Sequence, residues 1–325
     1  AAVLSKKTGH PVKMVMTRDE VFRASGPACG TSMQVRIGAT REGKITAGDA
    51  TLKFQAGAFA GSPVPAAAMC AFAPYDLEHV RSVGYDVLVN RPKVAAYRAP
   101  GAPLGEYAVE SVIDELAKAL ELDPIEFRLL NAVREGVDSS YGPKFGPIGC
   151  IQTLEAARDH DHYQTPLGSG QGRGVASGYW FNIGGQTSAT LNLSEDGSVA
   201  LVVGTPDIGG SRASLAMMTA ETLGIELDKV RPLVGDTSAL GYNMLTGGSR
   251  VTFAGGIAVV GAAEDLIRQL CERAALTWDL PLDDVEWIEG EARPANGRAG
   301  SEAPMSMAEI AKDMAKSGGP IVGRH

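Results

Sequence analysis

Three things are scarce in this sequence: paired cysteines, clustered positive charge and long apolar runs. Its four cysteines, Cys29, Cys70, Cys150 and Cys271, include no CxxC pair, so no zinc ribbon or iron–sulfur cluster is expected within the chain. The formal net charge is -8, and no basic stripe offers a surface for nucleic acid or an anionic membrane. Apolar runs such as Val64–Ala73 are shorter than the roughly 20 residues that span a bilayer, and no secretory signal pattern is present. We therefore expect a cytoplasmic protein.

Several nucleotide-binding and hydrolase motifs are also missing. No GxGxxG opens a helix after a strand, which disfavours a dinucleotide-binding Rossmann fold, and no GxSxG elbow indicates an α/β-hydrolase. The segment from Gly38 to Lys44 resembles a phosphate-binding P-loop, but Ile45 stands where that motif needs serine or threonine. His160 and His162 lack a third ligand at suitable spacing, so no metal site is predicted from the histidines.

The sequence does contain a repeated strand pattern. Residues 32–40 alternate apolar and polar side chains, the turn REGK follows, and the alternation resumes from Ile45, which predicts a hairpin. Residues 187–193 and 199–203 flank SEDG, whose Asp-Gly pair is typical of hairpin turns. With the helices described next, these hairpins predict an α+β fold of two α/β-type domains with hairpin-based sheets and packed helices.

Helical periodicity separates and follows the hairpins. Apolar residues four apart predict a helix over 104–120, and Asp123 followed by Pro124 predicts the start of a second helix. The remaining predicted elements are helices at about 151–158, at about 213–223 and from about Val251, and a short strand at 229–234.

The chain is expected to divide near its middle. Residues 137–174 are rich in Gly, Pro, Ser, His and Asp, which predicts a linker over 146–173 between domains over 1–145 and 174–325. A chain of 325 residues is long enough for two domains of about 100–200 residues each. Neither end carries a closing signal or an initiator methionine, so we expect a piece of a longer protein.

Two glycine-rich turns precede predicted helices in the second half. The first is GTPDIGGSR, which follows a strand at Gly204, and the second is TGGSRVTF, which begins at Thr246. Backbone N–H groups at such a helix start favour an anion, and two of them suit a ligand with more than one phosphate. A plain strand-to-helix loop is the alternative interpretation of each turn.

A third segment, AAYRAPGAP at residues 95–103, sets one arginine in a rigid and nearly apolar turn before the helix at 104–120. With these three segments side by side, the sequence resembles the molybdenum-binding subunit of the xanthine dehydrogenase and aldehyde oxidoreductase family. The segment KTGHPVKMVMTRDEVF resembles the family's region where a helix ends and a strand follows. The signatures ESxxDELA and LxxDPxExRxxN follow the arginine loop, and the likeness covers nearly the whole chain.

The resemblance implies an activity and a cofactor. Members of the family hydroxylate aldehydes, purines and other N-heterocycles with water as the oxygen source. They use molybdenum bound to molybdopterin, which in bacteria is often the cytosine dinucleotide. Electrons leave through iron–sulfur and FAD-containing partners, so this chain itself is expected to hold neither an iron–sulfur cluster nor FAD, and to bind neither nucleic acid nor a membrane.

The resemblance also implies roles for particular residues. The family's arginine loop approaches the metal and the substrate, which makes Arg98 the candidate catalytic residue and gives the pocket wall to Tyr97, Ala99, Pro100 and Gly101. Gln186 matches a family position near the oxo ligand of the metal. The two glycine-rich turns contact the cofactor in the family, which carries over to Thr205, Asp207, Ile208, Gly209, Gly210, Gly247, Gly248, Ser249, Arg250 and Thr252.

Three departures from the family pattern narrow these expectations. The sequence contains neither the family's GGGFG-type loop nor its GxGE motif with the catalytic glutamate, so the isolated chain is expected to be an inactive fragment or split subunit. Other segments of the molybdopterin domains would complete it. Pro100 replaces an aromatic residue of xanthine-type members, and no cysteine follows Arg98, which disfavours purines and carbon monoxide as substrates. A non-catalytic cofactor-binding or assembly module is the alternative.

Overall fold

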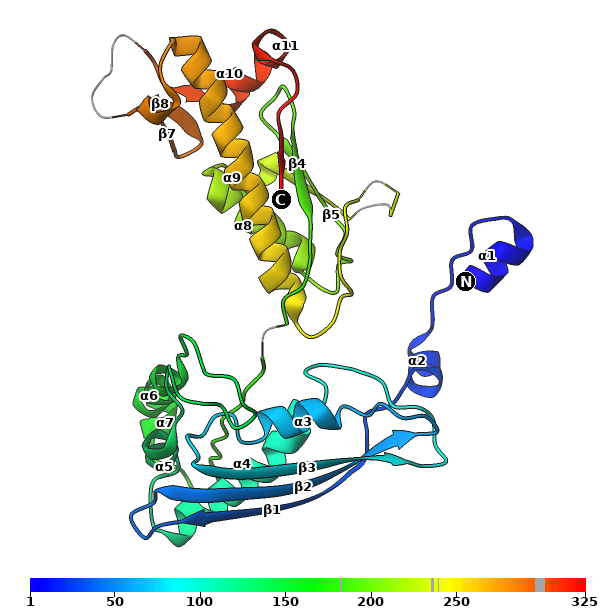
Figure 1. Cartoon of the computed structure of the whole chain (residues 1–325), viewed down its shortest axis with the longest axis vertical. Coiled ribbons are helices and arrows are strands. Elements are labelled where there is room, and N and C mark those ends of the chain that lie inside the picture. Colours follow the sequence, from blue (N-terminus) through cyan, green and yellow to red (C-terminus); the bar gives the residue numbers. More distant parts are fainter. Residues whose placement is uncertain (182, 235–236, 239, 296–301) are drawn as a thin grey trace. The chain divides into compact units, whose positions relative to one another are not determined.

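Two units make up the chain, Ala1–Phe181 and Asn182–His325, and each is described by itself (Figure 1). The computed structural model describes residues 1–181, 183–234, 237–238, 240–295 and 302–325. Both units contain the same order of elements: an antiparallel hairpin, a helix, a third strand parallel to the second, and a long helix. The α+β fold predicted from the sequence is confirmed.

The sheet of unit 1 has three strands in the order β1-β2-β3. Strands β1 (Thr31–Ala39) and β2 (Ile45–Gly57) form the predicted hairpin. Strand β3 (His79–Leu88) pairs with β2 in parallel. The sequence analysis missed β3, because its side chains are mostly exposed or half-buried and its apolar residues do not alternate cleanly.

The core of unit 1 lies between this sheet and two helices, α3 (Val64–Cys70) and α4 (Ala102–Ala119). Leu52 and Phe54 of β2 are fully buried and belong to the same apolar cluster as Val109 and Ile113 of α4. These α4 residues are spaced one helical turn apart, so they share one face of the helix. The helix predicted at 104–120 is therefore confirmed, and its apolar stripe faces the sheet.

Helix α5 (Pro124–Asn131) begins as predicted, with the Asp123 carboxylate accepting from the backbone N–H groups of Ile125 and Glu126. Helix α6 (Cys150–Asp159) packs on α5, and the short helix α7 (Asp161–Gln164) follows. Both lie within the range predicted as a linker. The division of the chain into domains at 146–173 stays a prediction.

The first residues form two short helices, α1 (Ala2–Thr8) and α2 (Arg18–Ala24). The strand expected at TRDEVF is wrong. Thr17 and Glu20 form a capping box, in which each side chain accepts from the backbone N–H of the other residue. A capping box satisfies N–H groups at a helix start, so this segment folds locally as a helix.

Unit 2 contains a four-stranded sheet in the order β10-β4-β5-β6. Strands β4 (Ala189–Leu193) and β5 (Val199–Val203) form the second predicted hairpin, and β6 (Val230–Val234) runs parallel to β5. Strand β10 (Val322–Arg324), which the sequence analysis missed, pairs with β4. Helices α8 (Ser211–Leu223) and α9 (Arg250–Trp278) supply the apolar side chains that cover the sheet.

The rest of unit 2 packs around the C-terminal part of α9. The strands β7 (Val285–Ile288), β8 (Glu291–Pro294) and β9 (Met305–Ser306) form a small antiparallel sheet. Helices α10 (Met307–Lys312) and α11 (Met314–Ser317) follow, and Met307, Ile310 and Met314 join the core. Among the described residues, no helix combines the length and apolarity needed to cross a membrane.

Candidate functional site

The arginine loop of unit 1 is a strained turn held against α3. Arg98 is exposed, and within the described residues it forms no hydrogen bond or ion pair. Ala99 has φ 45°, in the left-handed region that alanine rarely adopts. Gly101 has φ 91°, and a Cβ there would collide with the carbonyl oxygen of Pro63. The loop therefore presents the Arg98 side chain outward from a backbone that only this glycine allows.

The other predicted pocket-wall residues belong to the same turn. Tyr97 is 42% exposed, and burial, with a smaller effect of Cys29, raises the pKa of its phenol. Pro100 is half-buried. An exposed arginine beside an exposed aromatic ring can contact an anionic or planar ligand through hydrogen bonds or ring stacking.

The first glycine-rich turn of unit 2 leads from β5 into α8. Gly209 and Gly210 have φ 112° and 93°, and among the described residues no heavy atom beyond the adjacent residues lies within 4 Å of where a Cβ would stand at either position. Helix α8 has no side-chain cap, so its first N–H groups are left for another partner. Thr205 is buried, while Ile208 is 67% exposed. This turn offers an open surface of glycine backbone at a helix start.

The Asp207 side chain accepts hydrogen bonds within the same turn. Its carboxylate accepts from the backbone N–H of Gly209 at 3.1 Å and from the hydroxyl of Ser211 at 3.2 Å. Arg212 lies 3.7 Å from the other carboxylate oxygen. The hydrogen bond from Gly209 is the largest cause that lowers the pKa of Asp207. The carboxylate thus holds the shape of the turn from inside.

The second glycine-rich turn leads into α9. Gly248 and Ser249 both have left-handed φ angles, 66° and 61°, and α9 has no side-chain cap. Thr252 is exposed in the first turn of the helix, and Gly247 is half-buried. A Cβ at Gly248 would collide with Ile183. The conformation of this turn therefore depends on a glycine packed against the segment that precedes β4.

Arg250 does not point outward as expected of a side chain that contacts a cofactor. It is 1% exposed, and its guanidinium donates to backbone carbonyl oxygens of two loops, those of Gly184, Gly185, Gln186, Met244 and Leu245, and to the hydroxyl of Thr187. The guanidinium is thereby engaged within the protein. Only its backbone N–H remains for a ligand at the helix start.

The structure brings the two turns of unit 2 to the same end of that unit. Gly255 and Gly256, near the start of α9, lie against Leu215 and Met218, near the start of α8. The N-terminal parts of the two helices are therefore adjacent. Positive ends of two helix dipoles side by side favour an anion.

Gln186 lies in the same neighbourhood. Its side chain is exposed, while its carbonyl oxygen accepts from the backbone N–H of Met244 at 3.0 Å. Thr187 and Asn243 form an isolated antiparallel bridge, and Gly204 at the start of the first turn lies against Asn243. The three predicted segments of unit 2 thus meet around residues 243–245. The arginine loop belongs to unit 1, so the structure describes it separately.

Sequence reasoning missed a buried set of charged residues in unit 1. Arg128 is fully buried, and its guanidinium donates to the Glu110 carboxylate at 2.8 and 2.9 Å and to Asp114 at 2.8 Å. Tyr75 donates its hydroxyl proton to Glu110. Glu110 and Asp114 belong to the helix signature ESxxDELA, and Arg128 belongs to LxxDPxExRxxN. Their spacing was visible in the sequence, but nothing in it showed that the two motifs meet.

This set of residues also fixes the segment that ends unit 1. The Val175 carbonyl accepts from Arg128, Ser177 N–H donates to Glu110 at 2.7 Å, and Tyr179 N–H donates to Glu106 at 2.7 Å. Alternate residues of an extended segment are thus held by side chains of α4 and α5, in place of a neighbouring strand. Glu106 is half-buried, and this partial burial is the largest cause that raises its pKa.

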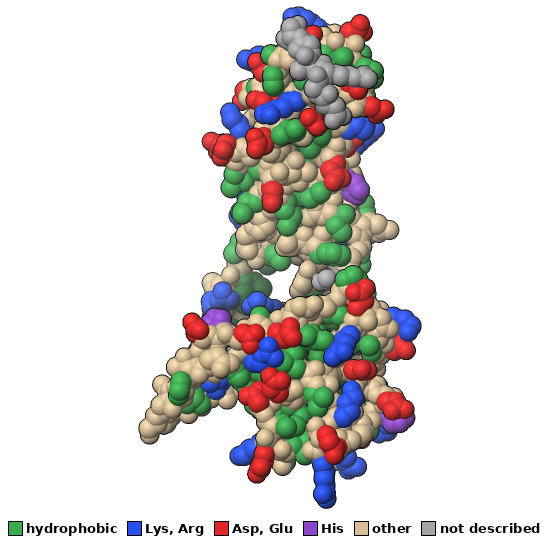
Figure 2. All heavy atoms as spheres, turned by 90° about the vertical axis from the view of Figure 1, so that its left-hand side faces the viewer, with side chains coloured by type: hydrophobic (Ala, Val, Ile, Leu, Met, Phe, Trp, Pro, Cys, Tyr) green, Lys and Arg blue, Asp and Glu red, His purple; other side chains and the backbone are tan. Residues whose placement is uncertain are grey.

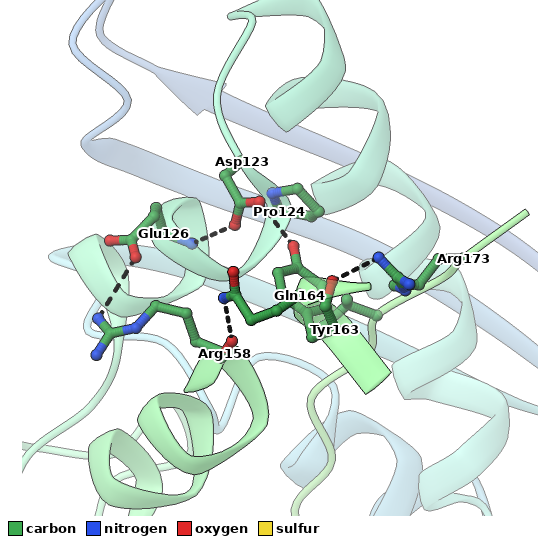
Figure 3. Close-up of a pocket in the computed structure, with 8 residues that line it drawn as sticks. Asp123, Pro124, Glu126, Arg158, Tyr163, Gln164 and Arg173 are labelled. Atoms are coloured by element: carbon green, nitrogen blue, oxygen red, sulfur yellow. Dashed lines mark hydrogen bonds and ion pairs between the residues drawn. The ribbon is translucent and has the colours of Figure 1, made fainter. Parts of the chain in front are cut away.

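A cleft in unit 1 with a volume of about 500 Å³ lies elsewhere (Figure 3). Its polar groups bond one another: Tyr163 donates to Asp123 at 2.7 Å, Arg173 donates to the Tyr163 carbonyl at 2.6 Å, and Arg158 pairs with Glu126 at 3.4 Å. None of the predicted site residues lines it. We interpret it as a surface groove between α5 and α7 that the protein's own contacts satisfy.

Two further observations concern charge and metal ligands. On the face shown in Figure 2, acidic and basic side chains are interspersed and form no large region of one sign. Within the described ranges, no group of three or more His, Cys, Asp or Glu side chains is placed to hold a metal ion.

Comparison with known proteins shows the family of this chain. The profile of the molybdopterin cofactor-binding domain matches residues 1–132, and a second profile of the same description matches residues 153–325. The chain belongs to the molybdopterin cofactor-binding family. The two matches cover both glycine-rich turns and the arginine loop, and the recognition made from the sequence motifs is confirmed.

The relatives of this molybdopterin-binding chain are molybdenum subunits. It is 30% identical over 249 residues to an aldehyde oxidoreductase molybdenum-binding subunit of Escherichia coli (strain K12), covering 73% of this chain and 34% of that one. It is 28% identical over 345 residues to a putative xanthine dehydrogenase molybdenum-binding subunit of the same strain, covering 96% and 44%. The fold matches that of reconstituted CO dehydrogenase from Oligotropha carboxidovorans with a TM-score of 0.81 and 22% identity, over 100% of this chain and 45% of that one. The chain thus spans less than half the length of these proteins.

Proposed function

We propose that this chain is part of a molybdenum hydroxylase that oxidises an aldehyde or an N-heterocycle, with water supplying the oxygen and with iron–sulfur and FAD subunits accepting the electrons. The observation that carries the proposal is the pair of uncapped helix starts in unit 2, each preceded by a glycine-rich turn, in a chain of the molybdopterin-binding family. When bound, the cofactor would supply the molybdenum redox chemistry.

The residues present fit a phosphate-bearing cofactor. Gly209 and Gly210 leave open space where side chains would otherwise stand, so a phosphate can approach the backbone closely. The first N–H groups of α8 and α9 have no side-chain cap and suit the oxygens of a diphosphate. The cytosine dinucleotide form of molybdopterin, with its two phosphates, is the form we propose.

Each remaining site residue then has a task that its position allows. The exposed side chains of Gln186 and Thr252 offer hydrogen bonds at the rim of these turns. Asp207 holds the first turn in shape through Gly209 and Ser211. Arg98, with Tyr97 and Pro100 beside it, would orient the substrate through a permanent positive charge on a rigid loop. We propose that purines and carbon monoxide are not substrates.

The second candidate is a non-catalytic cofactor-binding or assembly module of the same fold. It rests on the same pair of uncapped helix starts, which a cofactor-binding module without catalysis would also need. Both candidates require the two turns to bind the cofactor. They differ in what happens when the whole enzyme is supplied with substrate.

The test is an assay of the assembled enzyme with the wild-type chain and with Arg98→Ala. The hydroxylase proposal predicts dye-coupled oxidation of an aldehyde or an N-heterocycle by the wild type, and a large loss of rate in the variant at unchanged molybdenum content. An enzyme that holds molybdenum and pterin but oxidises neither substrate class would favour the module. An unchanged rate in Arg98→Ala would exclude the proposed role of this arginine.

A further inference from the structure

Arg250 is 1% exposed and is the only buried arginine or lysine among the described residues of unit 2. Its three guanidinium nitrogens donate to six acceptors, at 2.9 Å to Gly184, 3.0 Å to Gly185 and Gln186, 3.1 Å to Met244 and 3.3 Å to Leu245, and also to Thr187. Within the described residues, no carboxylate forms an ion pair with it. Among the described residues, the charge is therefore surrounded by neutral acceptors, five carbonyl oxygens and the Thr187 hydroxyl.

The location of this charge is unfavourable for the helix itself. Arg250 is the first residue of α9, and a cation at a helix N-terminus opposes the helix dipole. An arginine at this position can hold several loops in place in a way that no other side chain can. Its planar fork can bond several acceptors in fixed directions, whereas a lysine ammonium has three donors and no such plane.

The six acceptors belong to two segments, residues 184–187 and 244–245, which are far apart in the chain. These segments also contact each other directly, through the hydrogen bond from Met244 N–H to the Gln186 carbonyl and through the bridge between Thr187 and Asn243. Arg250 joins both segments to the start of α9. Gln186 lies in the first segment, and the turn Gly247–Ser249 directly follows the second.

We propose that Arg250 is a positioning residue, which locks residues 184–187 against residues 244–245 so that Gln186 and the Gly247–Ser249 turn are presented together at the start of α9. The residue acts through these loops, and its guanidinium does not touch the cofactor. The inference rests on the proposed function for the identity of the ligand. The locking of the two loops does not depend on it.

The test is amide hydrogen exchange of the full chain, measured by mass spectrometry, for the wild type, Arg250→Lys and Arg250→Ala. We expect exchange of peptides covering 183–188 and 241–249 to rise by about ten-fold or more in both variants. Exchange of the buried α9 segment 258–270 is expected to be unchanged. Arg268→Ala is the matched control, since Arg268 lies on the same helix and forms exposed ion pairs with Asp265 and Glu272.

Chemical rescue separates positioning from simple packing. In Arg250→Ala, added methylguanidinium should restore slow exchange in both loops, and methylammonium should not, because only the former is a planar fork. Unchanged loop exchange, or equal rescue by both cations, would overturn the proposal. Exchange that rises equally across unit 2 in both variants, including 258–270, would assign Arg250 to global stability and would also overturn it.

A cofactor measurement on the assembled enzyme distinguishes this inference from the proposed function. Arg250→Lys is expected to lower the molybdenum and pterin content relative to wild type, and Arg268→Ala is not. If the wild-type enzyme holds no molybdenum, the proposed function fails while the exchange experiment still decides the role of Arg250. If the lysine variant retains full cofactor despite loosened loops, the link from loop position to cofactor binding fails.

Discussion

Arg128 and Glu110 form a buried ion pair in which both Nε and Nη2 of the arginine donate to the same carboxylate oxygen, at 2.9 and 2.8 Å. The arginine side chain is fully buried and that of the glutamate is 7% exposed. Glu110 comes from α4 and Arg128 from α5, so the pair joins the two helices. The same carboxylate oxygen accepts from Ser177 N–H, which fixes the segment that ends unit 1.

Arg128→Met should strongly destabilise the protein. The substitution leaves the Glu110 carboxylate buried without its partner, which typically costs about 3–5 kcal/mol. Chemical denaturation followed by circular dichroism will measure the free energy of unfolding. Arg81→Met is the control, since Arg81 forms an exposed pair with Asp49 and such pairs contribute about 0–1 kcal/mol. Equal losses in the two variants would contradict the assignment of Arg128.

Asn131→Ala tests a second buried connection made by the helix signature. The Asn131 side chain accepts from Ile45 N–H at 2.8 Å and donates to the Gly43 and Phe127 carbonyls, both at 2.9 Å. Truncation leaves the N–H at the start of β2 without this partner, at a cost of about 1–3 kcal/mol. Hydrogen exchange at Ile45 should accelerate more than at Phe54. Protection of Ile45 equal to wild type would show that another group replaces the amide.

Gly101→Ala tests the strained backbone behind Arg98. The left-handed φ costs alanine about 1–2 kcal/mol, and the new methyl group would also collide with the Pro63 carbonyl. The free energy of unfolding should therefore fall by more than that. Gly136→Ala is a matched control, because Gly136 has φ 81° with no atom within 4 Å of a Cβ. If both variants lose the same stability, the contact with Pro63 has no energetic effect.

The pH dependence of stability should reveal the half-buried Glu106. Burial is the largest cause that raises its pKa, and the nearby Glu110 raises it further. A carboxyl with a raised pKa in the folded state binds its proton more tightly there than when unfolded, so stability falls as pH rises from the usual carboxyl range through the raised value. Glu106→Gln should remove this loss, giving a variant at least as stable as wild type at neutral pH. The difference should shrink on acidification.

For Glu309→Gln, we expect the effect on stability to depend on pH in the opposite direction. Hydrogen bonds from the Ser306 side chain and backbone lower the pKa of Glu309, so its contribution to stability is present above the usual carboxyl pKa and is lost as pH falls through the lowered value. This variant should be less stable than wild type at neutral pH, and the difference should vanish in acid. Thermal unfolding from neutral pH down to about pH 2, well below the ordinary carboxyl pKa of about 4, compares both variants. A difference for Glu106→Gln that grows in acid would contradict its assignment.

The sequence predicted those elements whose signal is local. The two hairpins, the stripe of α4, the Asp123 cap and the positions of α8 and α9 all follow from periodicity or from a cap within a few residues. Strands β3 and β10 were missed because β3 is largely exposed and β10 has three residues. The segment TRDEVF was predicted as a strand, but its own capping box makes it a helix.

The candidate site was predictable in outline and not in its internal contacts. Glycine pairs before helices marked both turns, since positive φ and close approach require glycine there. The direction of the Arg250 side chain was not predictable, because four of its six acceptors lie more than 60 positions away, at Gly184–Thr187. The meeting of Glu110 with Arg128 depends in the same way on how α4 packs against α5.

Molybdenum content tests the central claim most directly. The assembled enzyme containing this chain should be purified and analysed for molybdenum by mass spectrometry, for pterin by fluorescence after oxidation, and for cytidine monophosphate after hydrolysis. The account predicts one molybdenum, one pterin and one cytidine nucleotide for each copy of the chain. An assembled enzyme with neither molybdenum nor pterin would contradict it.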